Sequence, residues 1–279
     1  MLTVNLTTTY QRLKLCKITL VSLLMQTRLP DRIVVWVSKE PYLRDEGIAN
    51  DDLVNQLVKS LPGINSEIIS VRWVKNTGPY RKLIPMLREA APEDIIVTAD
   101  DDIFYGENWL KNLVEAYDAT SNTLVAARVR KIKTNFYGVN KSYLYWKIIT
   151  KPTTVDDDFV VTFGGGVALN RNMFREEDIH NEGYLKLAPT ADDLWFSKLV
   201  RQNKVKVKVL PSALQEINFI EHNDGLNNHN IPSVTSFIHR LRRKLWDRQL
   251  GHLGVHVCGN DRAFSRIETY FKDQEYKKS

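Results

Sequence analysis

The sequence contains few cysteines, no long hydrophobic run and no excess of proline or glycine. The two cysteines, Cys16 and Cys258, fit neither the spacing of a zinc site nor a disulfide framework. The longest aliphatic stretch, residues 18–25, is much shorter than the roughly 20 apolar residues that cross a bilayer. Charged residues make up 26% of the chain and are balanced in sign, which excludes an intrinsically disordered protein. We therefore expect a folded protein without a transmembrane helix.

The N-terminal sequence also lacks the pattern of a secretory signal. Residues 1–7 show no charged region followed by an apolar region and a small-residue cleavage site. Because no disulfide framework is present either, we expect the protein to lie in the cytoplasm. A chain of 279 residues is long enough for one large domain or two small ones.

Positive charge is concentrated near the C-terminus. Residues 231–279 contain ten basic and five acidic residues, and so carry five of the six net positive charges of the chain. Within them, residues 239–248 mix basic and apolar side chains, as does a helix that lies on an anionic lipid surface or on nucleic acid. The alternative is a solvated helix whose apolar stripe packs on the domain, and the single stripe favours it.

Strand and helix patterns alternate through the first hundred residues. The patterns predict strands at residues 4–6, 32–38, 68–74 and 94–98, and helices around residues 13–24, 53–57 and 83–90. Such alternation is typical of an α/β fold with a mostly parallel sheet and helices on both faces. Ligands bind such sheets beyond the carboxyl ends of the strands.

The second half of the chain has a less regular pattern. Its patterns predict a helix at residues 109–117, strands at 124–129 and 159–163, a helix at 191–203, a strand at 204–210, and an irregular stretch at about 133–158. Lysines alternate with apolar residues along the strand at 204–210. We expect them to protect an edge of the sheet from pairing with other chains.

Three consecutive carboxylates, Asp100, Asp101 and Asp102, follow the apolar strand that ends at Thr98. Adjacent carboxylates repel one another, and a divalent cation such as Mg²⁺ or Mn²⁺ would neutralise them. A turn or capping cluster before the next helix is the alternative. An EF-hand loop is excluded because Phe104 and Tyr105 stand where an oxygen ligand and glycine are required.

Two further features lie downstream. Asp192 and Asp193 open a helix, where the positive end of the helix dipole should favour their ionised forms and one of them could cap the helix. Residues 164–166 are three glycines that fit neither a P-loop nor a dinucleotide fingerprint. They are expected to permit close approach of a ligand or a loop to the backbone.

The order of these features resembles a GT-A fold glycosyltransferase. Four features occur in the order expected for glycosyltransferase family 2: the threonines that end the first strand, the acidic cluster, the glycines and the acid pair. The chain is similar to bacterial enzymes of surface polysaccharide synthesis over about residues 3–230. The resemblance implies a Rossmann-like GT-A sheet and sugar transfer from a nucleotide diphosphate donor to an acceptor hydroxyl. It also implies a divalent cation, Mn²⁺ or Mg²⁺, a donor that is commonly a UDP-sugar, and a saccharide or lipid-linked acceptor.

Carried over by position, the resemblance assigns roles to individual residues. It implies Asp193 as the general base with Asp192 as the second candidate, and Asp102 and His222 as metal ligands. The implied donor contacts are Thr7, Thr8, Thr9, Arg12, Ser38, Arg81, Lys82, Asp100 and Asp101. The implied acceptor contacts are Gly165, Gly166 and Trp195. The doublet Asp192-Asp193 departs from the commoner Glu-Asp pairing of the family, so the choice of base between the two stays open.

The resemblance further implies three segments and leaves three other functions open. Residues 1–103 would bind the nucleotide-sugar, residues 104–230 the acceptor, and residues 231–279 would form a basic helical extension that could attach the protein to the inner face of the cytoplasmic membrane. Inverting transfer is favoured over retaining transfer. A sugar-phosphate nucleotidyltransferase would need a glycine-rich, arginine-containing loop after the first strand, where this chain has threonines. A non-enzymatic membrane or nucleic-acid binding module would depend on the basic tail, and no nucleic acid partner is expected.

Overall fold

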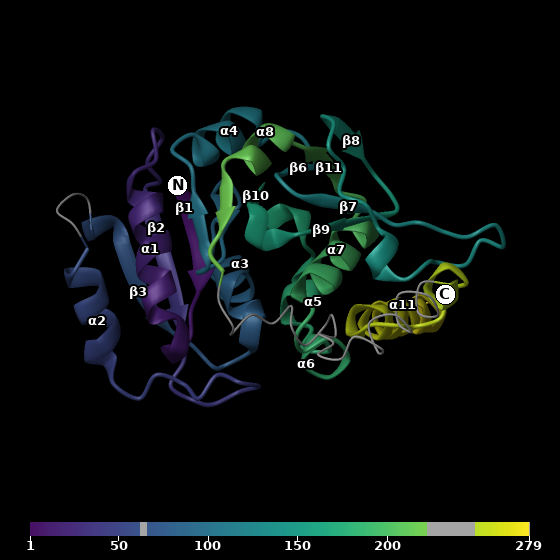
Figure 1. The fold of residues 1–279 in the computed structure, drawn as a ribbon, viewed down its shortest axis with the longest axis horizontal. Coiled ribbons are helices and arrows are strands. Elements are labelled where there is room, and N and C mark those ends of the chain that lie inside the picture. The colour runs from purple at the N-terminus through teal and green to yellow at the C-terminus, as the bar shows by residue number, and fades with distance from the viewer. Residues whose placement is uncertain (62–65, 222–248, 279) are drawn as a thin grey trace, which may run out of the picture.

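The computed structural model describes residues 1–61, 66–221 and 249–278, which form a central eight-stranded sheet with helices on both faces (Figure 1). The strands of this sheet are β1 (Leu2–Thr7), β2 (Arg32–Val37), β3 (Ile69–Trp73), β4 (Ile95–Thr98), β6 (Thr123–Ala126), β8 (Thr153–Val155), β10 (Val167–Leu169) and β11 (Lys206–Val209). Their order is β3-β2-β1-β4-β10-β6-β11-β8. All strands except β10 and β8 run in the same direction. The predicted α/β fold with a mostly parallel sheet is confirmed.

The sheet is buried on both faces because its central strands are apolar at nearly every position. In β2, Val34 and Trp36 contribute to the core on one face, and Ile33, Val35 and Val37 contribute to the core on the other. A continuous run of β-branched residues is typical of such a doubly covered parallel strand.

Helices cover each face. One face packs against α1 (Leu13–Leu24), α2 (Asp51–Lys59), α4 (Trp109–Ala116) and α8 (Pro211–Gln215). The other packs against α3 (Ile84–Glu89), α5 (Glu176–His180), α6 (Tyr184–Leu187), α7 (Asp192–Gln202) and α11 (Gly259–Lys278). Cys16, Leu20 and Leu23 place one apolar stripe of α1 on the sheet, as the helical spacing predicts.

The remaining short elements border the sheet. Two small antiparallel pairs join β5 (Ile103–Tyr105) to β12 (Ile217–Phe219) and β7 (Val129–Lys131) to β9 (Phe159–Val161). Single 3-10 turns are η1 (Tyr10–Arg12), η2 (Ser66–Ile68), η3 (Gly78–Lys82), η4 (Tyr143–Tyr145), η5 (Phe163–Gly165) and η6 (Arg171–Met173).

One expectation about the sheet is corrected, and one strand, β10, is not among those predicted. The predicted edge position of the lysine-rich strand is wrong, because β8 pairs with the outer side of β11. Alternating exposure along Lys206–Val209 shows that only one face of that strand meets solvent, which does not require an unpaired edge. The antiparallel strand β10 follows the three glycines directly and fills the gap between β4 and β6.

The predicted C-terminal helix is confirmed over residues 259–278, where α11 packs against α7. Glu268 accepts ion pairs from Lys198 at 2.7 Å and from Arg201 at 2.5 Å. Phe271 lies on Trp195, with 5.1 Å between the ring centroids. The predicted basic helix at 239–248 lies outside the described residues. Within the described ranges, no helix combines the length and the apolar character that a membrane span requires.

Candidate active site

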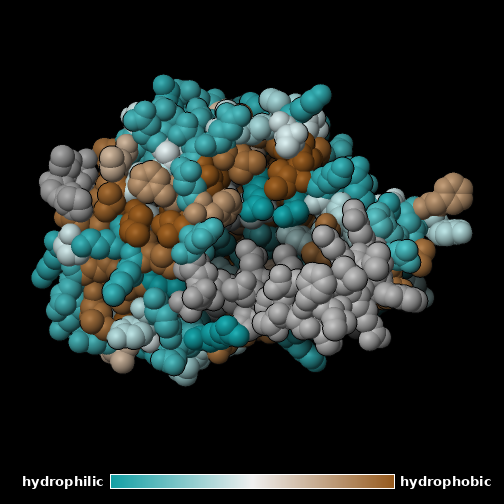
Figure 2. Space-filling view, viewed as in Figure 1, coloured by the Kyte–Doolittle hydropathy of each residue, from teal (hydrophilic) through white to brown (hydrophobic). Residues whose placement is uncertain are grey.

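The carboxyl ends of the parallel strands bring the predicted site residues to one edge of the sheet. Thr8 follows β1, Ser38 follows β2, Asn76 comes shortly after β3, and Asp100 comes shortly after β4. Figure 2 shows a hollow lined by hydrophilic residues in the middle of one face, where Figure 1 draws β9 and β10. The rule that ligands bind at this end of a parallel sheet therefore points to this region.

A buried lysine joins the two acidic clusters. Lys82, at the end of η3, is 4% exposed, and its Nζ lies 2.8 Å from Asp100 Oδ1 and 2.9 Å from Asp192 Oδ2. Burial alone would lower the pKa of Lys82, but the nearby carboxylates, Asp100 first, raise it well above its ordinary value. Lys82 is therefore a fixed positive charge between the cluster that follows β4 and the acid pair that opens α7.

A second cation neutralises the rest of the acidic cluster. The Arg12 guanidinium lies 2.5 Å from Asp101 Oδ1 and 2.7 Å from Asp102 Oδ2. Burial raises the pKa of Asp101 to about 6, although the charge of Arg12 opposes the shift. The three consecutive carboxylates are thus held by two cations from distant parts of the chain. Asp101 and Asp102 also lie in the turn between β4 and β5, so the turn alternative describes their backbone.

Asp193 is a weak acid in this site. Its Oδ1 accepts a hydrogen bond of 2.8 Å from the Phe163 amide. Burial, followed by the neighbouring Asp192 carboxylate, raises the pKa of Asp193 to about 7. The predicted effect of the helix dipole is wrong for Asp193, because removal from water outweighs it. Neither aspartate caps α7, whose N-cap is Ala191 without a side-chain hydrogen bond.

The three glycines make room for side chains of the protein itself. A Cβ on Gly164 would lie 1.7 Å from Asp100 Oδ2, and a Cβ on Gly166, at φ +106°, would lie 2.6 Å from Trp109 Nε1. The indole of Trp109 donates to the Gly165 carbonyl at 3.1 Å. The close approach that the sequence predicts therefore comes from Asp100 and Trp109, and a role of Gly165 and Gly166 toward an acceptor stays a prediction.

Tyr105 fixes the position of Asp100. The Tyr105 hydroxyl accepts a hydrogen bond of 2.8 Å from the Asp100 amide and donates one of 2.7 Å to the Gly164 carbonyl. Burial raises the pKa of Tyr105 well above its ordinary value, so the phenol stays protonated and keeps this donor. Asp100 is thus held by Tyr105 through its backbone and by Lys82 through its carboxylate.

The prediction that Trp195 contacts the acceptor is wrong. Its side chain is fully buried in the core between α7 and α11. The indole packs against Tyr184 and Phe271, with ring centroids 5.8 Å and 5.1 Å away. No face of the ring is open to a ligand.

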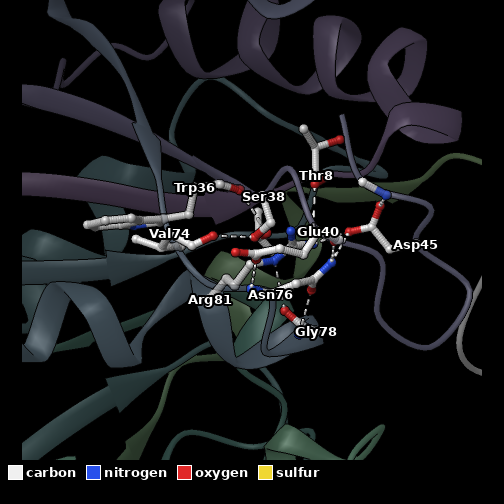
Figure 3. A network of polar contacts seen from close by, with 11 residues as sticks. Thr8, Trp36, Ser38, Glu40, Asp45, Val74, Asn76, Gly78 and Arg81 are labelled. Atoms are coloured by element: carbon white, nitrogen blue, oxygen red, sulfur yellow. Dashed lines mark hydrogen bonds and ion pairs between the residues drawn. The ribbon is translucent and has the colours of Figure 1, made fainter. Parts of the chain in front are cut away.

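Arg81 belongs to a separate buried network that follows the first three strands (Figure 3). Its Nη2 lies 2.8 Å from Asp45 Oδ2, and its Nε donates to the Gly78 carbonyl at 3.2 Å. Asn76 Nδ2 donates to the same Asp45 oxygen at 2.9 Å. Burial lowers the pKa of Arg81 despite the opposing charge of Asp45. Its Nη1 is buried and has no hydrogen-bond partner among the described residues.

Two of the hydroxyls predicted to contact a donor, those of Thr7 and Ser38, have structural partners, whereas Thr8 Oγ1 is buried without one among the described residues. Thr7 Oγ1 donates to the Trp36 carbonyl at 2.9 Å, and Ser38 Oγ donates to the Val74 carbonyl at 2.7 Å, so both tie neighbouring strands together. The Thr9 carbonyl accepts the Arg12 amide at 3.0 Å and begins η1. These residues line the edge where the site lies, and their roles toward a ligand stay predictions.

Sequence reasoning did not identify Asp45 and Arg128. Asp45 lies in an irregular loop after β2. Only its burial beside Arg81, which the structure shows, distinguishes it from the other acidic residues of that loop. The sequence pattern predicts a strand that extends to Val129, but β6 ends at Ala126, so Arg128 lies just beyond a strand end. Burial lowers the pKa of Arg128, while Asp193 and Asp100 raise it, which places this cation in the electric field of the acidic site.

The donor atoms at the site suit a hard cation. Asp102, one predicted ligand, is a partly exposed carboxylate next to Arg12. His222, the other, lies outside the described residues. The described part of the chain holds no group of three or more His, Cys, Asp or Glu side chains arranged for a metal. Mg²⁺ and Mn²⁺ fit one or two carboxylates together with substrate phosphates, so the residues present fit such an ion.

Comparisons with known proteins identify a family. A sequence profile described as glycosyl transferase family 2 matches residues 6–177. No curated protein matches the chain. The fold is similar to 4-diphosphocytidyl-2C-methyl-D-erythritol synthase from Anaerococcus prevotii DSM 20548, with 14% identity, coverage of 75% of this chain and 86% of that one, and a TM-score of 0.46. It is also similar to a mannosyltransferase from Pyrobaculum calidifontis in complex with GDP-Man and Mn²⁺, with 16% identity, coverage of 96% and 69%, and a TM-score of 0.47.

Proposed function

Because the chain belongs to glycosyl transferase family 2, we propose that it transfers a sugar from a nucleotide diphosphate donor to an acceptor hydroxyl with inversion at the anomeric carbon. One observation carries this proposal. Lys82 lies within 3 Å of both Asp100 and Asp192, so the carboxylates proposed for the donor and those proposed for the acceptor meet in one site. The donor and the acceptor are thus proposed to bind on either side of Lys82.

The donor is proposed to bind across the ends of the first four strands. Arg81 supports this placement, since its buried Nη1 lacks a partner among the described residues and could donate to the nucleotide base or ribose. Thr7, Thr8, Thr9 and Ser38 border the same region. Asp100 or Asp101 would accept a ribose hydroxyl, and Arg12 and Lys82 supply positive charge for the diphosphate.

Asp193 is proposed as the general base. Its carboxylate would accept the acceptor's hydroxyl proton as that oxygen bonds to the anomeric carbon and the diphosphate leaves. A pKa of about 7 makes the Asp193 carboxylate more basic than an exposed aspartate while it remains partly ionised at neutral pH. The hydrogen bond from the Phe163 amide fixes its orientation. Asp192, which pairs with Lys82, is the second candidate.

A divalent cation is proposed to assist the reaction. Mn²⁺ or Mg²⁺ held by Asp102, with His222 as a second predicted ligand, would act as a Lewis acid that offsets charge on the departing diphosphate. The site holds five carboxylates, Asp100 to Asp102 with Asp192 and Asp193. Among the described residues, two cations, Lys82 and Arg12, form ion pairs with four of them. This excess of negative charge supports the proposal of a dication.

The acceptor is proposed to be a saccharide or a lipid-linked saccharide in bacterial surface polysaccharide synthesis. The family resemblance supports this role, with a UDP-sugar as the favoured donor and the inner face of the cytoplasmic membrane as the place of reaction. Product analysis by NMR would give the anomeric configuration, and retention of the donor configuration would contradict the inverting assignment.

A thermal-shift panel tests the donor class. The protein is heated with each nucleoside diphosphate, with and without Mn²⁺, since a ligand that binds only the folded state raises the apparent Tm. We expect one nucleotide, UDP by preference, to raise Tm, and to do so more strongly with the cation. The proposal fails if no nucleoside diphosphate raises Tm under either condition.

A further inference from the structure

A loop between β7 and β8 projects from the body of the molecule, at the right of Figure 1. Its tip has a defined conformation. Asn135 Oδ1 accepts hydrogen bonds from the amides of Tyr137, at 2.9 Å, and Val139, at 3.0 Å. The Asn135 amide donates to the Val139 carbonyl at 2.8 Å, and Gly138 adopts φ +76°, which glycine favours. The loop therefore presents its side chains from a hydrogen-bonded turn.

Two aromatic side chains stand at this tip with almost no protein contact. Phe136 is 98% exposed and Tyr137 is 81% exposed. Their rings pack edge to face on each other, with 5.8 Å between centroids. Figure 2 shows a hydrophobic side chain clear of the surface at the same corner of the molecule. An ordered turn that exposes a phenylalanine so fully is unfavourable in water, and contact with an apolar partner would relieve that cost.

A second segment adds apolar side chains beside the tip. Asn135 Nδ2 donates to the Leu253 carbonyl at 3.3 Å, which holds the segment that precedes α11 against the loop. Leu253 is 61% exposed, and Val139 and Val255 are exposed as well. We call the group Phe136, Tyr137, Val139, Leu253 and Val255 the tip patch.

The chain around the tip patch is strongly cationic. Residues 128–151 contain seven Lys or Arg residues and no Asp or Glu. Lys133, Lys147 and Lys151 are exposed, and none of the three forms an ion pair with a carboxylate in the described part of the chain. The acidic residues of α11 nearest to this segment are already engaged: Asp261 accepts from the Ser142 hydroxyl, and Glu268 pairs with the lysine and arginine of α7.

We propose that the tip patch docks on a membrane surface containing anionic lipids, with the aromatic side chains in the headgroup region and the three lysines at the lipid phosphates. Charge complementarity favours this partner, because residues 128–151 around the tip patch carry seven basic residues and no carboxylate, and such a segment is attracted to an anionic surface. Aromatic rings flanked by lysines are typical of interfacial contacts. The same segment begins with Arg128 beside the acidic site, so docking would bring that site near acceptors in the membrane. The docking itself does not depend on the proposed transfer reaction.

Vesicle sedimentation of the full chain tests this proposal without any donor or acceptor. We expect the protein to sediment with vesicles containing about 30% phosphatidylglycerol in phosphatidylcholine and to stay in solution with pure phosphatidylcholine. Raising NaCl from about 0.1 M to about 0.5 M should weaken the attachment. Equal partition onto both lipid compositions would overturn the proposal.

Two sets of variants assign the contact to the tip patch. The substitutions F136S and Y137S together should lower the partition coefficient about tenfold or more. The matched control, I18S with M25S, removes two exposed apolar side chains on α1 and at its C-cap and should leave partition unchanged. Figure 1 draws α1 at the other end of the molecule from the loop. Circular dichroism should show that both proteins are folded, since all four side chains lie on the surface.

The lysines are tested in the same way. Replacing Lys133, Lys147 and Lys151 by Gln should lower the partition coefficient about a hundredfold at low salt. Each basic residue near an anionic surface raises that coefficient by about tenfold or less. Replacing the exposed Lys14, Lys59 and Lys111 by Gln changes net charge equally and should have a much smaller effect. Wild-type binding by the tip variant overturns the proposal. The proposal is also overturned if the wild-type protein does not bind the vesicles and instead forms a dimer, detected by light scattering, that F136S with Y137S abolishes.

Discussion

Lys82 and Asp192 form a buried ion pair, 2.9 Å long, that connects the loop after β3 to the start of α7. The same ammonium contacts Asp100 after β4 at 2.8 Å. One side chain thus determines the spacing between two acidic clusters that lie far apart in the sequence. The geometry of the candidate site depends on this lysine more than on any single carboxylate.

Removing the lysine should destabilise the protein. K82M leaves two carboxylates close together without their cation, and we expect a loss of about 3 kcal/mol in the free energy of unfolding. D192N should reduce this loss when combined with K82M, because one of the uncompensated charges is then gone. Urea denaturation at neutral pH measures all four proteins of this double-mutant cycle. Additive effects of the two substitutions would contradict the pairing, and K14M, an exposed substitution on α1, serves as the control.

Asp193 should make the stability of the protein depend on pH. Its pKa of about 7 in the folded protein exceeds the ordinary value of 3.8, so the folded state binds the proton more tightly. The stability linked to Asp193 is therefore full below about pH 4 and is lost as pH rises through about 7. D193N removes this loss while its side-chain oxygen can still accept from Phe163. We expect the Tm of D193N to exceed that of wild type at pH 8 by a few degrees, roughly 2–4 °C, and by less at pH 5. An equal difference at both pH values would contradict the assignment.

Arg81 should affect both stability and nucleotide binding. R81M leaves Asp45 buried without its cation and should cost about 3–5 kcal/mol in the free energy of unfolding. Adding D45N should restore much of that stability. If Arg81 Nη1 contacts the donor, the double variant should still fail to show the nucleotide-dependent rise in Tm. Recovery of that rise together with stability would show that Arg81 only supports the fold.

Gly164 should tolerate no side chain while Asp100 stays in place. A Cβ there would lie 1.7 Å from Asp100 Oδ2, so G164A must displace that carboxylate from Lys82. We expect loss of activity and a lower Tm. The double variant G164A with D100A removes the collision and should regain the Tm lost by G164A without regaining activity. If G164A keeps wild-type activity, the close contact between Gly164 and Asp100 is not needed for function.

The sequence predicts the first half of the fold because its local signals agree with the tertiary structure. The run at residues 32–38 is apolar and β-branched, and it becomes the doubly buried strand β2. Helical spacing from Leu13 to Leu24 matches α1 to the residue. The position of Asp100 directly beyond a strand also follows from the pattern, since parallel strands expose their carboxyl ends at one edge.

The sequence does not predict features that depend on distant contacts. The adjacent Asp192 is visible in the sequence, but the larger cause of the raised pKa of Asp193 is its removal from water, which the sequence does not show. Trp195 is an aromatic residue of the type that stacks on sugars, but it lies on the buried side of α7. Strand β10 is only three residues long and follows three glycines, so its place in the sheet rests on pairing with β4 and β6.

The most direct test of the proposed function measures transfer from the donor found in the thermal-shift panel as a function of pH, with Mn²⁺ present. Wild-type kcat/KM should rise with pH through about 7, since Asp193 must lose its proton to act as the base. D193N should lose about 10²–10⁴-fold in kcat and keep its affinity for the nucleoside diphosphate. Turnover by D193N at the wild-type rate would contradict the account.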